Sequence, residues 1–224
     1  MTTRKLPIVT SEIYHIFNRS VGQQPIFRNI YENKLFVELI EYYHFFHTNL
    51  RFSYYNRLPK DQRDKILKDL YIKKLFNIEI YSFSLMPNHF HLLAMQKSEK
   101  GISNFVRCLQ DSYAKYFNMK NKREGALFQS PFKSVRMETE EQLLHVSRYI
   151  HLNPLTSYVL RNKEDLINYQ WNSFRDYVSA SPRRFIKTNL ISSFFNKNNS
   201  FEEFTFNQLD YQRKLKMVKH LILE

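Results

Sequence analysis

The fold is decided by residues 78–95, which read IEIYSFSLMPNHFHLLAM. β-Branched and aromatic residues flank the break at Met86-Pro87-Asn88, and this pattern predicts two short strands joined by a turn. Because side chains alternate between the two faces of a strand, His89 and His91 share one face of the second strand. Two neighbouring imidazoles suit a divalent metal ion if a third ligand comes from elsewhere in the chain. On its own such a pair is more often structural than ligating, so the metal site depends on the remaining sequence.

The segments around this hairpin alternate between strand and helix periodicity. The predicted elements are a strand at 13–19, a helix at 32–47, a charged helical insertion at about 49–76, a helix at 102–119, a strand at 132–137, and a helix from 139 to about 153, where Pro154 ends it. This order predicts an α+β fold, in which an antiparallel sheet of about four strands is covered on one side by helices.

The composition indicates a folded, basic protein. At 224 residues the chain is expected to form one main domain with elaborations. Its formal net charge is +13, and a protein this basic is expected to bind a polyanion, most commonly nucleic acid. A basic surface that serves solubility alone is the alternative. The 20 Phe and 15 Tyr residues among the cations also suit stacking on bases.

The cysteine and glycine counts exclude several classes of site. A single cysteine, Cys108, excludes an internal disulfide framework and a cysteine-rich zinc site, and it is consistent with a reducing compartment. Three dispersed glycines, Gly22, Gly101 and Gly125, exclude a glycine-rich phosphate loop and a dinucleotide fingerprint. The N-terminal residues lack the apolar core of a signal peptide and no apolar run approaches a membrane span, so we expect a cytoplasmic protein without a membrane partner.

A second group of candidate residues lies at the end of the last predicted core helix. The expected buried stripe of this helix consists of Leu143, Val146, Ser147 and Ile150. Tyr149 and Asn153 are four residues apart, so a hydroxyl and an amide fall together at the edge of this stripe. Taken alone, Tyr149 is an ordinary aromatic residue at the core edge and Asn153 an ordinary helix-terminal residue before proline.

The string LMPNHFHLL at 85–93 resembles the histidine-hydrophobic-histidine (HUH) motif of the IS200-like single-tyrosine (Y1) transposases, including the REP-associated tyrosine transposases. Three further stretches are similar to the same family and occur in its order: YHIFNR at 14–19, GALFQSPFKS at 125–134 and RYIHLNP at 148–154. The resemblance covers roughly residues 13–177, apart from the charged insertion. It implies a ferredoxin-like (RRM-like) sheet in a Y1 transposase-like HUH domain at 8–178. The remaining residues, 179–224, form a basic, aromatic C-terminal extension with a candidate helix at 208–223.

Matching positions assign roles by resemblance. His89 and His91 would be metal ligands and Tyr149 the nucleophile, while Asn153 would complete the metal site directly or through water, since some relatives carry Gln there. The implied metal is Mg²⁺ or Mn²⁺, held by two imidazoles and one oxygen ligand with open positions for a scissile phosphate. Family members often carry Gly and Arg where this chain has Ser130-Pro131, which is a departure at a potential phosphate contact.

The resemblance also implies a reaction and a substrate. Tyr149 Oη attacks a phosphodiester of single-stranded DNA beside a hairpin, releases a 3′-hydroxyl and leaves a 5′-phosphotyrosine, which a second 3′-hydroxyl can reverse without ATP. His145, four residues earlier, is a candidate helper in removing the tyrosine proton, or equally a surface histidine. Candidate contacts to the DNA backbone are Arg19, Lys133 and Arg136, each equally consistent with solvated charge. Strand periodicity puts Lys133 and Arg136 on opposite faces.

These observations leave three functional hypotheses. The leading one is a metal-dependent single-tyrosine DNA transposase that nicks and rejoins single-stranded DNA, either as a monomer or as a homodimer. The second is a domesticated, non-catalytic nucleic-acid-binding relative that uses the same sheet and basic surface. The third is a metal-dependent hydrolase unrelated to DNA, for which the net charge of +13 would be incidental.

Overall fold

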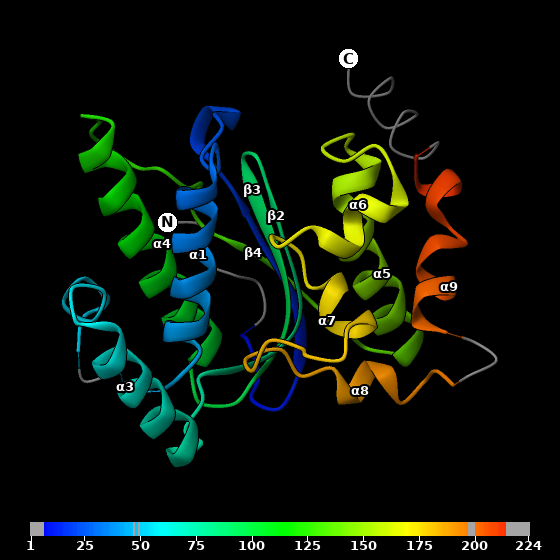
Figure 1. The fold of residues 1–224 in the computed structure, drawn as a ribbon, viewed down its shortest axis with the longest axis horizontal. Helices are drawn as coiled ribbons and strands as arrows, with labels where there is room; N and C mark the ends of the chain where they lie inside the picture. Colours follow the sequence, from blue (N-terminus) through cyan, green and yellow to red (C-terminus); the bar gives the residue numbers. More distant parts are fainter. Residues whose placement is uncertain (1–6, 47, 49, 197–199, 214–224) are drawn as a thin grey trace.

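The centre of the protein is a four-stranded antiparallel sheet with the strand order β2-β3-β1-β4 (Figure 1). The structure is a computed structural model that describes residues 7–46, 48, 50–196 and 200–213. The strands are β1 (Ile13–Arg19), β2 (Ile78–Met86), β3 (His89–Gln96) and β4 (Lys133–Arg136). These bounds confirm the predicted hairpin and the predicted strands before and after it.

One face of the sheet packs against two long helices, α1 (Ile30–Tyr43) and α4 (Gly101–Lys120). Alternate residues of the strands supply the sheet side of this first core, among them Ile16 of β1 and Phe90 of β3. Phe36 of α1 is fully buried between them and α4. Both helices were predicted from their apolar spacing, and both begin within two residues of the predicted start.

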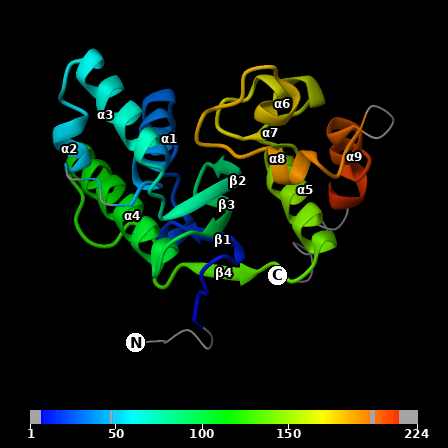
Figure 2. The same ribbon diagram turned by 90° about the horizontal axis from the view of Figure 1, so that it is seen from below.

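The predicted charged insertion is helical. It forms α2 (Phe52–Tyr55) and α3 (Lys60–Lys73), which lie on the same side of the sheet as α1 (Figure 2). Of the residues in α3, only Tyr71 is buried, so its charge run makes a solvated face as the sequence predicted.

The opposite face of the sheet is covered by α5 (Glu140–Thr156), so the expectation that helices cover only one side is wrong. Figure 2 shows the sheet between α1 and α4 on one side and α5 with the later helices on the other. The later helices are α6 (Lys163–Asn168), α7 (Phe174–Val178), α8 (Asn189–Ser192) and α9 (Phe201–Phe206). Together with Leu93 and Ile150 they form a second core. β2 is buried along nearly its whole length, as expected for a strand covered on both faces.

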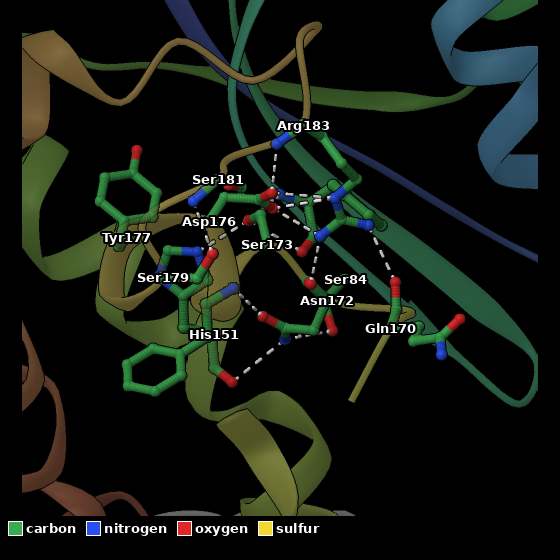
Figure 3. Close-up of polar contacts among 12 residues, drawn as sticks. Ser84, His151, Gln170, Asn172, Ser173, Asp176, Tyr177, Ser179, Ser181 and Arg183 are labelled. Atoms are coloured by element: carbon green, nitrogen blue, oxygen red, sulfur yellow. Dashed lines mark hydrogen bonds and ion pairs between the residues drawn. The ribbon is translucent and has the colours of Figure 1, made fainter. Parts of the chain in front are cut away.

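α5 continues past Pro154, although the sequence predicted that this proline ends the helix. Proline lacks the backbone N–H that would bond to the carbonyl of Ile150, four residues earlier. The side-chain amide of Asn172 donates to this carbonyl at 3.3 Å. It also donates to the carbonyl of His151 at 3.1 Å (Figure 3). A side chain from a following loop therefore replaces the missing donor, and the helix runs on to Thr156.

The described part of the predicted C-terminal extension packs against the rest of the chain. Phe185 and Ile186 join the first core, and Phe201 joins the second. Most of the helix predicted at 208–223 lies outside the described residues, and the division of the chain after residue 178 stays a prediction. Among the described helices, none combines the length and the apolar character needed to cross a membrane.

Candidate active site

Strand pairing arranges one face of the sheet in rows that run across the strands. One row joins Ser84 of β2, His91 of β3, Phe17 of β1 and Lys133 of β4. The neighbouring row joins Met86, His89 and Arg19. Paired residues point to the same side of a sheet, so both histidines, Phe17, Arg19 and Lys133 lie on one face, here called the histidine face. It is also the face that carries Leu93 into the second core, against α5.

The ring of His89 is held by the turn that precedes it. Its Nδ1 lies 2.6 Å from Oδ1 of Asn88, whose amide nitrogen donates to the carbonyl of Gln23 at 3.0 Å. That second bond fixes the orientation of the amide, so Asn88 Oδ1 accepts and His89 Nδ1 donates. The neutral ring then carries its lone pair on Nε2, which is the tautomer that a metal ligand needs.

The ring of His91 is held by His15, a residue that the sequence reasoning did not single out. His91 Nδ1 lies 2.9 Å from His15 Nε2, and the two rings stack with centroids 5.1 Å apart. Burial lowers the pKa of His15 to about 4, so this ring is neutral at pH 7. One of the two nitrogens must donate; when His91 donates from Nδ1, its lone pair is on Nε2. The available signal was strand alternation, which puts His15 on the same face as Phe17.

Tyr149 meets the histidine face from α5. Its ring centroid is 5.6 Å from that of His91, with the ring planes at 87°, and 6.1 Å from that of His15. The rings of His89 and His91 are 5.0 Å apart. The tyrosine remains 39% exposed, so a ligand from solvent can reach it. The structure thus brings Tyr149 of the second predicted group to His91 of the first, as the resemblance implied.

Asn153 follows Tyr149 by one turn of α5 and is only 1% exposed. The sequence placed it at the edge of a buried stripe, but the last turns of α5 are enclosed on their outer side by the second core. Neither Nδ2 nor Oδ1 of Asn153 has a hydrogen-bond partner among the described residues. A buried polar group without a partner costs about 1–3 kcal/mol, so a ligand at this amide would offset an existing penalty.

The residues that the resemblance assigns to the metal are two imidazoles on the histidine face and one amide on α5, and donors of these types suit a weakly held divalent ion. Across the described part of the chain, no three His, Cys, Asp or Glu side chains come together in a way that could hold a metal ion. The candidate donors are therefore the Nε2 atoms of His89 and His91 and the buried amide of Asn153. Two imidazoles and one amide oxygen leave several coordination positions for a phosphate and water, as in sites that act on phosphodiesters.

Both ring nitrogens of His145 contact side chains of its own helix, α5. Its Nδ1 accepts a hydrogen bond from Arg148 at 2.6 Å, and its Nε2 lies 3.5 Å from Glu141. Arg148 in turn stacks its guanidinium 4.3 Å above the ring of Phe204. These contacts give His145 a structural role in α5 and offer no support for it as the helper of Tyr149.

The three candidate DNA-binding cations are divided between the two faces of the sheet. Arg19 and Lys133 are exposed on the histidine face. Arg136 pairs with Tyr14 of β1 on the opposite face and forms an ion pair with Glu12 at 2.6 Å. The predicted separation of Lys133 from Arg136 is therefore confirmed, and only Arg19 and Lys133 lie on the side of the histidines.

A buried polar network attaches α5 to β2 (Figure 3). Ser147 Oγ lies 3.1 Å from Ser82 Oγ, and His151 Nε2 lies 2.8 Å from Ser173 Oγ. Ser173 Oγ also accepts the backbone N–H of Phe83 at 2.8 Å. These bonds fix the depth and rotation of α5 on the sheet, and so the position of Tyr149 relative to His91.

The comparisons with known proteins agree with this architecture. Residues 36–153 match the family model described as "Transposase IS200 like", which is more than half of the chain. The protein therefore belongs to the IS200-like transposase family, as its motifs indicated. None of the curated proteins compared matches the sequence.

One solved structure is similar over almost the whole chain. It is that of a REP-associated tyrosine transposase bound to a REP hairpin, with a TM-score of 0.53 and 11% sequence identity. The match covers 89% of this chain and 97% of the other. At this identity the similarity supports the fold, an open four-stranded antiparallel sheet with helices, and confirms the predicted fold class.

Proposed function

We propose that the protein is a metal-dependent transposase that nicks and rejoins single-stranded DNA beside a hairpin, with Tyr149 as the nucleophile. The observation that carries the proposal is the position of the Tyr149 ring, 5.6 Å from the ring of His91. Membership of the IS200-like transposase family supports the reaction class. The hairpin bound in the similar solved structure and the net charge of +13 support the substrate.

His89 and His91, with Asn153, would hold Mg²⁺ or Mn²⁺. The ion would neutralise charge on the non-bridging oxygens of the scissile phosphate. Tyr149 Oη attacks phosphorus in line, its bond to phosphorus forms as the bond to the 3′-oxygen breaks, and the departing oxygen becomes a 3′-hydroxyl. The 5′-phosphate stays on the tyrosine until another 3′-hydroxyl attacks the same phosphorus and restores a phosphodiester.

The direct test is the covalent adduct. Hairpin DNA with unpaired flanks and a 3′-end label is incubated with the protein and Mn²⁺, because a 5′-phosphotyrosine keeps the 3′ part of the strand on the protein. We expect a labelled protein band on a denaturing gel, and its loss in Tyr149→Phe, which removes only the hydroxyl. Tyr158→Phe is the matched control, since Tyr158 is 56% exposed just beyond the end of α5.

The outcomes separate the functional hypotheses. An adduct that survives Tyr149→Phe would show that another residue is the nucleophile. Tight, salt-sensitive DNA binding without any adduct in the wild-type protein would favour the non-catalytic relative. Failure to bind DNA would favour a hydrolase that acts on another substrate.

A further inference from the structure

Phe17 is an aromatic side chain on the histidine face that the hydrophobic cores do not explain. It is half-buried, and it belongs to neither of the two cores formed by the described residues. Its ring lies beside the rings of the candidate site, with centroids 4.9 Å from His15 and 5.6 Å from His91. Packing in the interior therefore gives no reason for a phenylalanine at this position.

The neighbour of Phe17 on the outer side is a cation. Lys133 pairs with Phe17 across β1 and β4, and its Nζ lies 6.0 Å from the centre of the ring. Lys133 is exposed and forms no ion pair with an acidic side chain in the described part of the chain, whereas Arg136, on the other face of the same strand, is paired with Glu12. Of these two cations of β4, the one without an acidic partner among the described residues is therefore the one on the side of the histidines.

The sheet is open to solvent at this edge. β4 is the outermost strand, and Val135, which follows Lys133 on the same face, is 53% exposed. Across the strands the order is therefore His91, Phe17 and Lys133: a candidate metal ligand, an aromatic ring and an unpaired cation.

We propose that Phe17 and Lys133 form a nucleotide subsite, in which an unpaired base of the DNA strand stacks on Phe17 and its phosphate contacts Lys133. Aromatic rings on the open face of an antiparallel sheet stack unpaired bases without strong sequence preference, and a nearby cation binds the backbone. Phe17 is directly opposite His91 in the sheet. The stacked base would therefore be an unpaired nucleotide close to the phosphate that Tyr149 attacks. The identity of the strand rests on the proposed function.

The test is a coupling experiment between protein and DNA. Binding is measured by fluorescence anisotropy in the Tyr149→Phe background, so that no cleavage interferes, with a hairpin oligonucleotide whose unpaired flanks have mixed sequence. Single abasic sites are placed at each flank position in turn. Phe17→Ala should weaken binding of the intact strand about 5- to 150-fold, the range of one base stacked on an aromatic ring. One abasic position should weaken wild-type binding similarly and add nothing to Phe17→Ala.

Further variants separate stacking from folding. Phe17→Tyr keeps the ring and should bind like wild type. Phe17→Leu keeps apolar bulk but lacks the ring face, and it serves if Phe17→Ala unfolds. Tyr54→Ala is the control, since Tyr54 is 56% exposed on α2, beyond the opposite face of the sheet. Lys133→Gln should reduce the slope of log affinity against log salt by about 0.7, the value for one phosphate contact to a single strand.

Two results would overturn the subsite. In the first, the losses of affinity from the abasic site and from the Phe17 substitution are additive at every flank position. In the second, neither the abasic sites nor the Phe17 substitutions weaken binding. Either outcome is independent of the proposed function, because the measurement requires binding and no chemistry. An adduct through Tyr149 without coupling at Phe17 would leave the function standing and remove the subsite. Coupling at Phe17 without an adduct would support the subsite and contradict the proposed function.

Discussion

Asn172 is the residue whose loss we expect to disturb α5 most. It is fully buried; its amide nitrogen donates to the carbonyl of Ile150, and its oxygen accepts the N–H of Phe174 at 2.7 Å. Truncation to alanine leaves that carbonyl and that N–H buried without these partners, at about 1–3 kcal/mol each. We expect Asn172→Ala to lower the free energy of unfolding by about 2–6 kcal/mol, a large part of the roughly 5–15 kcal/mol typical of a domain.

A substitution of Pro154 tests more directly than Asn172→Ala alone whether Asn172 replaces the donor that the proline lacks. Pro154→Ala restores a backbone N–H that can bond to the carbonyl of Ile150, so Asn172→Ala should cost less in that background. The difference should be about 1–3 kcal/mol, the penalty of one unsatisfied buried carbonyl. Urea denaturation of the wild type, both single variants and the double variant measures it. Equal losses in the two backgrounds would refute the role given to Asn172.

Three further predictions concern assembly, the metal site and pH. Tyr149 meets His91 of its own chain, so a mixture of Tyr149→Phe and His91→Ala variants should form no adduct; recovery would show that the tyrosine acts across a homodimer. His15→Phe removes the hydrogen bond to His91 and should weaken Mn²⁺ binding about 10- to 100-fold in calorimetry. An unchanged affinity would contradict the inference that His15 orients His91 as a metal ligand. Burial lowers the pKa of His44 from 6.5 to about 4, so its contribution to stability is complete above pH 6.5 and is lost as the pH falls toward 4. Between pH 7 and 5 that contribution should fall by about 2 kcal/mol, and a denaturation profile that His44→Phe leaves unchanged would contradict it.

Local patterns were sufficient for the elements that carry the site. Alternation within 78–95 predicted both strands of the hairpin and put His89 and His91 on one face, as the pairing with β1 and β2 confirms. The same periodicity separated Lys133 from Arg136. These predictions succeed because the direction of a side chain in a strand depends only on its position along that strand.

The features that the sequence did not reveal depend on residues far apart in the chain. The residues around Pro154 carry no sign that the amide of Asn172 will supply the donor that proline lacks. In the same way, the contact of His15 with His91 exists only because β1 lies between β3 and β4. No local pattern encodes the order of strands in a sheet, so a short motif can point to candidate ligands while the residue that contacts one of them goes unnoticed.

Asn153 shows why burial adds to what a motif can say. Read from periodicity, it was a polar residue at the edge of a helix, for which no ligand is needed. In the structure it is 1% exposed, and both of its polar atoms lack a partner among the described residues. An apolar side chain of the same shape would pack there without the penalty of about 1–3 kcal/mol that the amide carries. Departures from the rules of packing concentrate at functional sites, and this one lies one turn from Tyr149. Its burial therefore argues more strongly for Asn153 as part of the metal site than its place in the sequence does.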